Sequence, residues 1–172
     1  MKKILSTLII LALLTSCSTD GGLDSMTGGQ ATSEQTPGDK MGTFELPSVT
    51  ANAGEEPSIG ELIGAAPDSL QIKDVIVGTG ATANAGSTLE VHYALMSYSN
   101  SVLVESSWRS NQTATFALSG VIPGWQEGIP GMKEGGRRLL IVPPALGYRD
   151  IGNGPIAPNE TLVFVVDLIK VS

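Results

Sequence analysis

The sequence predicts an α+β domain in which one short helix packs against an antiparallel sheet of about six strands. Two observations lead to this fold class. Between residues 67 and 172, short segments with the alternation of β-strands follow one another, separated by glycine, asparagine and proline turn signals. Only one segment, which begins at Pro123, has the features of a helix. A domain of this length is able to bury a core of its own.

The first two expected strands cover residues 70–77 and 89–95. The second alternates cleanly and places Leu89, Val91, Tyr93 and Leu95 on one face. His92 falls on the opposite face. No carboxylate or second histidine stands beside it at the spacing of metal ligands, so we expect a surface or hydrogen-bonded group.

Further strands are expected at residues 102–107, 113–118, 138–142 and 161–169. Residues 138–142 are apolar on both faces, as a central strand of a covered sheet would be. The segment 145–159 is rich in Gly, Pro and Asn and is long for a connection in a small domain. Long ordered loops often carry function, so this loop is a candidate for part of a site.

The expected helix follows the run VIPGWQEG at residues 121–128. Pro123 suits the first turn of a helix, where its missing N–H is not needed. Trp125 and Ile129 are four residues apart and share a helix face, which makes Trp125 a core candidate. We expect the glycine pair at 135–136 to end the helix and the arginine pair at 137–138 to neutralise its end.

The N-terminus predicts export and a lipid anchor. Residues 1–16 carry an early lysine pair and an apolar run that is too short to span a bilayer, as in a signal peptide. The run ends in LTSC at 14–17, which resembles the lipobox of bacterial lipoproteins, whose cysteine is acylated. Cys17 is the only cysteine, which excludes a disulfide and a cysteine-ligated zinc site. Because Ser18 is not the aspartate that retains such lipoproteins at the inner membrane, we expect an outer-membrane anchor facing the periplasm, or one at the cell surface.

Residues 17–66 are expected to be a disordered acidic linker, and the domain is expected to begin at residue 67. The stretch from 18 to 66 is rich in Gly, Ser, Thr and Pro and holds eight acidic residues against one lysine. It also accounts for most of the net charge of −7. No basic patch is present, which argues against nucleic acid as a partner.

No motif of nucleophilic, metal or dinucleotide chemistry occurs in the chain. It lacks G-x-S-x-G, H-E-x-x-H, a phosphate-binding loop and a dinucleotide fingerprint. The single histidine has no nucleophile beside it. We therefore expect no metal and no cofactor, and an enzyme of this sequence would work through a pocket.

Several short runs, taken in their order and spacing, resemble the FKBP-type peptidyl-prolyl isomerases over nearly the whole domain. These runs are VHY at 91–93, ESS at 105–107, VIPGW at 121–125, GMKEG at 131–135, LGY at 146–148, and PN at 158–159 followed by TLVF at 161–164. The resemblance implies a five- or six-stranded antiparallel sheet curled around one short helix. It also implies a shallow apolar pocket between the helix and the sheet.

The resemblance assigns roles to individual residues. Trp125 would form the pocket floor, and the Tyr148 hydroxyl and the Ile122 N–H would bond the ligand's carbonyl groups. Glu105 stands at the acidic position of the family's pocket. The remaining wall residues would be Tyr93, Val104, Phe116, Val121, Ile122, Ile156 and Phe164. For Tyr93, Phe116 and Phe164, a purely structural place in the core is an open alternative.

Three departures from the family pattern bear on rate and inhibitor affinity. Val104 and Glu105 stand where Phe-Asp is common, and Ala114 replaces a frequent aromatic residue. Arg149, rather than glycine, follows Tyr148. Two functions therefore remain open: an isomerase that assists the folding of exported proteins, or a tethered binding module for proline-containing segments. Expected partners are proline-containing polypeptides and macrolide inhibitors, and we expect a monomer.

Overall fold

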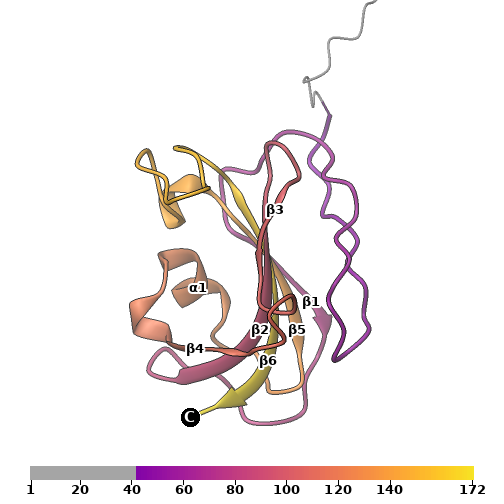
Figure 1. Ribbon diagram of the computed structural model, residues 1–172, viewed down its shortest axis with the longest axis vertical. Coiled ribbons are helices and arrows are strands. Elements are labelled where there is room, and N and C mark those ends of the chain that lie inside the picture. Colours follow the sequence, from indigo (N-terminus) through magenta and orange to yellow (C-terminus); the bar gives the residue numbers. More distant parts are fainter. Residues whose placement is uncertain (1–41) are drawn as a thin grey trace, which may run out of the picture. The chain divides into compact units, whose positions relative to one another are not determined.

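The computed structural model describes residues 42–172, which form one antiparallel sheet with a helix on one face (Figure 1). The signal peptide, Cys17 and residues 18–41 of the expected linker lie outside the described residues. The strands are β1 (Gln71–Ile76), β2 (Thr88–Ser97), β3 (Leu103–Ser106), β4 (Ala114–Ala117), β5 (Arg137–Val142) and β6 (Leu162–Val171). The predicted fold class is confirmed.

The sheet order is β1-β5-β6-β2-β3, and β4 also pairs with β2. β2 is long enough to pair with β4 over residues 88–91 and with β3 over residues 94–96. Its other side pairs with β6 along most of its length. β5 is buried throughout, with Leu140 and Val142 on one face and Leu139 and Ile141 on the other, as expected for a central strand.

The helix α1 (Pro123–Gly128) lies against the inner face of the sheet (Figure 1). Two glycines permit a close approach to β5. A Cβ atom at Gly124 would collide with Val142, and one at Gly128 would lie 2.8 Å from a methyl group of Leu140. The buried residues on this side of the sheet form one apolar group, which we call the inner cluster. It packs Leu89, Val91, Tyr93 and Leu95, the face of β2 predicted to be apolar, with Trp125 and Ile129. Trp125 is therefore confirmed as a core residue.

The expected end of the helix is wrong. α1 ends at Gly128, because Pro130 follows and has no N–H with which to continue the helical hydrogen bonds. Arg138 Nη1 donates to the Gly128 carbonyl at 2.8 Å, so this arginine does neutralise the helix end. Arg137 points to the other face of the sheet and pairs with Asp167 at 2.5 Å.

The N-terminal ribbon, residues 42–66, packs on the outer face of the sheet, opposite α1 (Figure 1). Its two arms meet through the bridges Glu45↔Ile63 and Val49↔Ile59. Leu62 is 3% exposed and lies in an outer cluster with residues of β5 and β6. The expected domain start at residue 67, with a disordered linker before it, is therefore wrong for residues 42–66.

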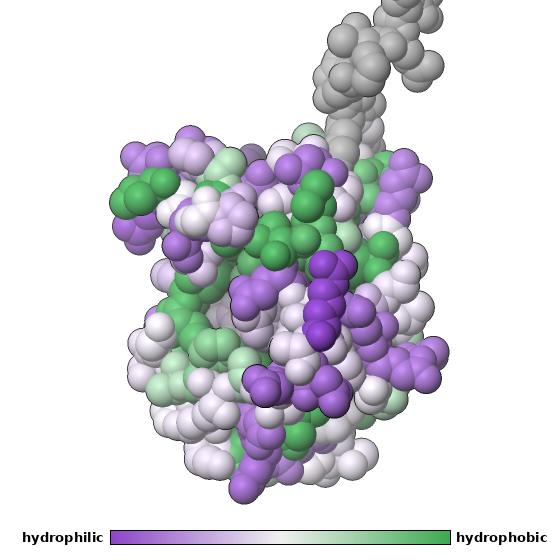
Figure 2. Space-filling view, viewed as in Figure 1, coloured by the Kyte–Doolittle hydropathy of each residue, from purple (hydrophilic) through white to green (hydrophobic). Residues whose placement is uncertain are grey.

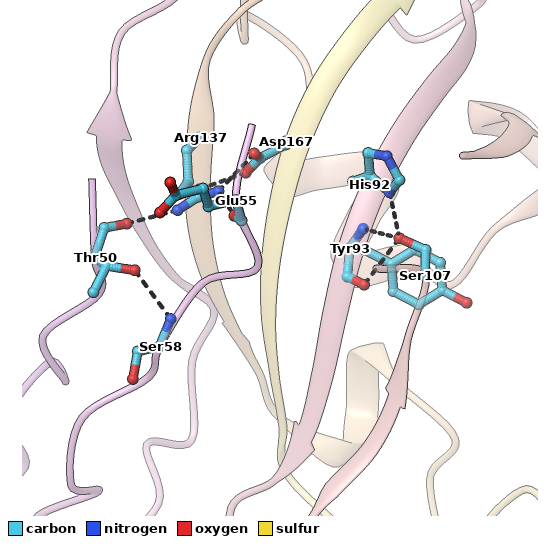
Figure 3. A network of polar contacts seen from close by, with 8 residues as sticks. All are labelled: Thr50, Glu55, Ser58, His92, Tyr93, Ser107, Arg137 and Asp167. Atoms are coloured by element: carbon cyan, nitrogen blue, oxygen red, sulfur yellow. Dashed lines mark hydrogen bonds and ion pairs between the residues drawn. The ribbon is translucent and has the colours of Figure 1, made fainter. Parts of the chain in front are cut away.

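Arg137 fixes the ribbon to the sheet. Its side chain is fully buried and binds both carboxylate oxygens of Asp167 (Figure 3). The remaining guanidinium donors reach the carbonyls of Thr50 at 2.7 Å and Glu55 at 2.6 Å. Because a buried charge needs all its donors satisfied, these two ribbon carbonyls complete the site of the ion pair.

Candidate active site

A pocket of about 400 Å³ opens between α1 and the inner face of the sheet. α1 supplies its floor, β2, β3, β4 and β6 supply walls, and the loop after β5 lies at its rim. The lining residues are Tyr93, Leu95, Glu105, Phe116, Gly120, Val121, Ile122, Trp125, Tyr148 and Phe164. A pocket of this size with few polar groups is typical of sites that bind small apolar groups.

Trp125 forms the floor and is 4% exposed. Its ring meets Tyr93, Phe116 and Phe164 edge to face, with centroid distances of 5.9, 5.7 and 5.4 Å. Perpendicular ring contacts are favoured by the charge distribution of aromatic rings. The floor is therefore a rigid aromatic surface whose orientation is fixed by three walls.

The polar side of the pocket is made by Glu105 and Tyr93. Burial raises the pKa of the Tyr93 hydroxyl well above its usual value, and its hydrogen bond to the Glu105 carboxylate raises this pKa further. The raised pKa keeps the Tyr93 hydroxyl protonated at neutral pH, as a donor beside the Glu105 side chain. Glu105 faces this side because it pairs with Leu95, whose side chain also lines the pocket. A β-bulge follows this pair: Met96 pairs with Leu103, so Val104 is the extra residue.

Tyr148 stands on the loop that follows β5, two residues after the short 3-10 helix Pro144–Leu146. Its carbonyl accepts the N–H groups of Ile151 and Gly152. Arg149 adopts a left-handed conformation with φ of 52°, which favours glycine. Backbone bonds from Arg149 N–H to Pro144 and from Asn159 N–H to Arg149 hold it there. Arginine at the usual glycine position thus leaves the loop ordered.

Two hydrogen-bond donors at the pocket have no acceptor within residues 42–172. They are the Ile122 N–H, at the start of α1, and the Tyr148 hydroxyl. The Trp125 Nε1 is buried and also lacks an acceptor in this part of the chain. Donors that face a pocket without an internal acceptor suit a ligand that brings carbonyl oxygens.

Eight of the ten pocket residues expected from the sequence line this cavity. Val104 and Ile156 do not. Val104 packs at the edge of the inner cluster, and Ile156 is 6% exposed within it. Leu95 and Gly120 were missed. The alternation of β2 placed Leu95 on the same face as Tyr93, so this residue could have been predicted. Gly120 has no side chain, so its sequence pattern could not indicate a place in the pocket wall.

Cys17, the expected site of the lipid anchor, lies outside the described residues.

His92 is a hydrogen-bonded group on the outer face of β2, as expected. Its Nδ1 lies 2.9 Å from the Ser107 hydroxyl, and its ring stacks on Trp108 at 4.0 Å. The Ser107 hydroxyl also accepts the Tyr93 N–H at 2.9 Å (Figure 3). These contacts fix the backbone of Tyr93 to Ser107, the residue that follows β3.

Within residues 42–172, no three His, Cys, Asp or Glu side chains come together as a metal site would require. In the same part of the chain, no helix is long and apolar enough to cross a membrane.

Comparison with known proteins matches residues 80–169 to the family described as FKBP-type peptidyl-prolyl cis-trans isomerase. Residues 1–18 match the prokaryotic membrane lipoprotein lipid attachment site. A probable FK506-binding protein of Corynebacterium glutamicum is 49% identical over 116 residues, covering 67% of this chain and 98% of the relative. The outer membrane protein MIP of Legionella longbeachae is 40% identical over 107 residues, covering 61% and 45%. The crystal structure of FkpA from Escherichia coli matches with a TM-score of 0.57 and 36% identity, covering 60% and 48%.

Proposed function

Because the chain belongs to the FKBP-type peptidyl-prolyl cis-trans isomerases, we propose that it isomerises Xaa-Pro bonds of exported proteins in the pocket over Trp125. The observation that carries this proposal is the aromatic floor beneath two donors that lack an internal acceptor. An apolar ring fits over Trp125, and carbonyl oxygens fit the donors. A proline residue and its neighbouring peptide groups supply both.

The proposed mechanism needs no covalent intermediate. Rotation about the Xaa-Pro bond breaks amide resonance, against a barrier of about 18–20 kcal/mol. The twisted amide is less dipolar than either planar isomer, so a dry apolar pocket favours it over the ground state. The proline ring packs on Trp125, while Tyr148 and the Ile122 N–H fix adjacent carbonyls. A thousandfold acceleration requires only about 4 kcal/mol of such preference.

Membership of an isomerase family does not favour the alternative of a binding module without turnover. Proline-containing polypeptides are the proposed substrates. Macrolides are proposed to occupy the same pocket, and we propose that the protein acts as a monomer.

Replacing Tyr148 with phenylalanine tests the pocket with little change in volume. If the hydroxyl bonds substrate, Tyr148→Phe should lower kcat/KM by roughly 5–50-fold, about 1–2.3 kcal/mol. The fold should be preserved, because the hydroxyl has no partner within residues 42–172. A protease-coupled assay on an Xaa-Pro tetrapeptide measures the rate.

Tyr98→Phe is the matched control for this variant. The Tyr98 hydroxyl donates to the carbonyls of Ile63 and Gly64 on the outer face of the sheet. Its loss should lower the melting temperature and leave kcat/KM unchanged. Equal turnover by Tyr148→Phe and wild type would refute the role given to Tyr148, and wild type without acceleration would refute the proposed function.

The lipid attachment site supports a lipid-anchored protein of the cell envelope. We further propose the outer membrane, facing the periplasm, supported by the relative named as an outer membrane protein. Cys17→Ala should abolish labelling with radioactive palmitate and release the protein from the membrane fraction. Cys17→Ala protein that still sediments with membranes would show that the anchor is elsewhere.

A further inference from the structure

We propose that Glu56 is a positioning residue of the isomerase pocket, acting through Ser106 on Glu105. Glu56 belongs to the N-terminal ribbon and lies outside residues 80–169, the part of the chain that matches the family. This inference rests on the proposed function, because it gives Glu105 a part in the pocket. It makes the ribbon a component of the catalytic unit rather than a spacer before it.

The contact that carries the inference joins the ribbon to β3. The Ser106 hydroxyl donates to Glu56 Oε1 at 2.5 Å, across 50 positions of sequence. Hydrogen bonds to an ionised carboxylate are shorter and stronger than neutral ones. Ser106 is buried, at 9% exposure, and directly follows Glu105, whose side chain lines the pocket. A shift of Ser106 therefore moves the backbone that carries Glu105.

β3 is held from one side only, by its pairing with β2 and by the bonds of the following residue, Ser107, to β2. It is four residues long, lies at the edge of the sheet and pairs only with β2. The bulge at Val104 interrupts that pairing just before Glu105. In Figure 2 the surface over β3 faces the solvent, with apolar side chains gathered beside strongly hydrophilic ones. On this open side, the bond to Glu56 is the side-chain hydrogen bond that ties β3 to the ribbon.

The backbone beside Glu56 is held in place, because the preceding residue, Glu55, is hydrogen-bonded to Arg137 of β5. The Glu55 carbonyl accepts from Arg137 Nη2 at 2.6 Å, and Arg137 is fully buried. The anchor thus runs from a buried guanidinium on β5, through the ribbon, to the C-terminal end of β3. On the pocket side, the Glu105 side chain lines the cavity together with Tyr93.

The test removes the Glu56 carboxylate and leaves the pocket residues unchanged. Glu56→Ala should lower kcat/KM by about three- to tenfold, because one charge-assisted hydrogen bond that orients Glu105 is lost. Glu56→Gln, which keeps an acceptor oxygen, should restore most of the activity. Glu55→Ala is the matched control: it removes the neighbouring charge, whose carboxylate binds only Asn52 among the described residues, and should match wild type.

Two double variants distinguish positioning from a general loss of stability. In a Glu105→Ala background, Glu56→Ala should change kcat/KM by less than about twofold, because its effect passes through Glu105. Glu56→Ala combined with Ser106→Ala should lose no more than either single variant. Each rate is measured well below the melting temperature of its variant.

The outcomes separate this inference from the proposed function. Active wild type with an impaired Glu105→Ala variant, but a Glu56→Ala variant equal to wild type, overturns the positioning role and leaves the isomerase assignment standing. If Glu56→Ala lowers kcat/KM as much in the Glu105→Ala background as it does in wild type, the positioning role is also overturned. Wild type without acceleration overturns the proposed function and this inference together.

Discussion

A chain that begins at residue 67 should unfold at a temperature roughly 10 °C or more below that of a chain that begins at residue 42. The shorter chain loses Leu62, whose burial contributes about 2–4 kcal/mol, judged from leucine truncations in other cores. It also removes the two carbonyls that satisfy Arg137. Hydrogen bonds to a charged group contribute about 1.5–3 kcal/mol each, although water that enters will replace part of this.

Point variants within the N-terminal ribbon locate the effect. Leu62→Ala should lower the free energy of unfolding by about 2–4 kcal/mol, because Leu62 is 3% exposed. Leu46→Ala changes the same residue type at 39% exposure and should lower it by less than about 1 kcal/mol. Calorimetry on both variants gives the comparison. Similar melting temperatures for the 67–172 and 42–172 chains would show that the ribbon adds nothing to stability.

The strands and the inner core could be predicted because their signal is periodic. Every expected strand exists, and the face of β2 that carries Tyr93 is the buried inner face. Alternation has this power because a strand with one covered face must keep its apolar side chains in register. The apolar pattern of β5 likewise predicted that both of its faces are covered. It did not predict that the N-terminal ribbon covers the outer face.

The ordered structure of the N-terminal ribbon could not be predicted, because isolated contacts rather than a periodic sequence pattern hold the ribbon in place. Its pairing is limited to isolated bridges, and its burial depends on a few apolar residues in a polar stretch, such as Val49, Ile59 and Leu62. Its bonds to Arg137 use backbone carbonyls, which every residue type possesses. Composition therefore indicated a linker where tertiary contacts form an ordered element.

Most of the pocket could be predicted through family resemblance, and the differences have a local cause. The bulge in β3 is the clearest example. Glu105 faces the cavity opposite Leu95, whereas Val104 is the extra residue and packs at the edge of the inner cluster. No alternation rule anticipates an extra residue in a strand. The displacement of Ile156 into the core likewise depends on the path of a long loop rather than on a pattern in the sequence.

Trp125→Ala should cause the largest loss of activity of any single substitution in the pocket. It removes the floor and the three edge-to-face contacts that orient Tyr93, Phe116 and Phe164. Truncation of a buried aromatic residue costs about 3–5 kcal/mol of stability. Because both the floor and the walls are lost, kcat/KM should fall by about a hundredfold or more, or about 2.7 kcal/mol.

Trp125→Phe separates the loss of activity from the loss of stability. The Trp125 Nε1 has no acceptor within residues 42–172, so phenylalanine forfeits ring area but no internal hydrogen bond. The phenylalanine variant should keep the fold and retain more than about a tenth of wild-type kcat/KM, because an aromatic floor remains. Both variants are assayed on the same Xaa-Pro peptide at a temperature where circular dichroism shows them folded. A folded Trp125→Ala variant with wild-type kcat/KM would mean that the proline ring does not bind over this residue.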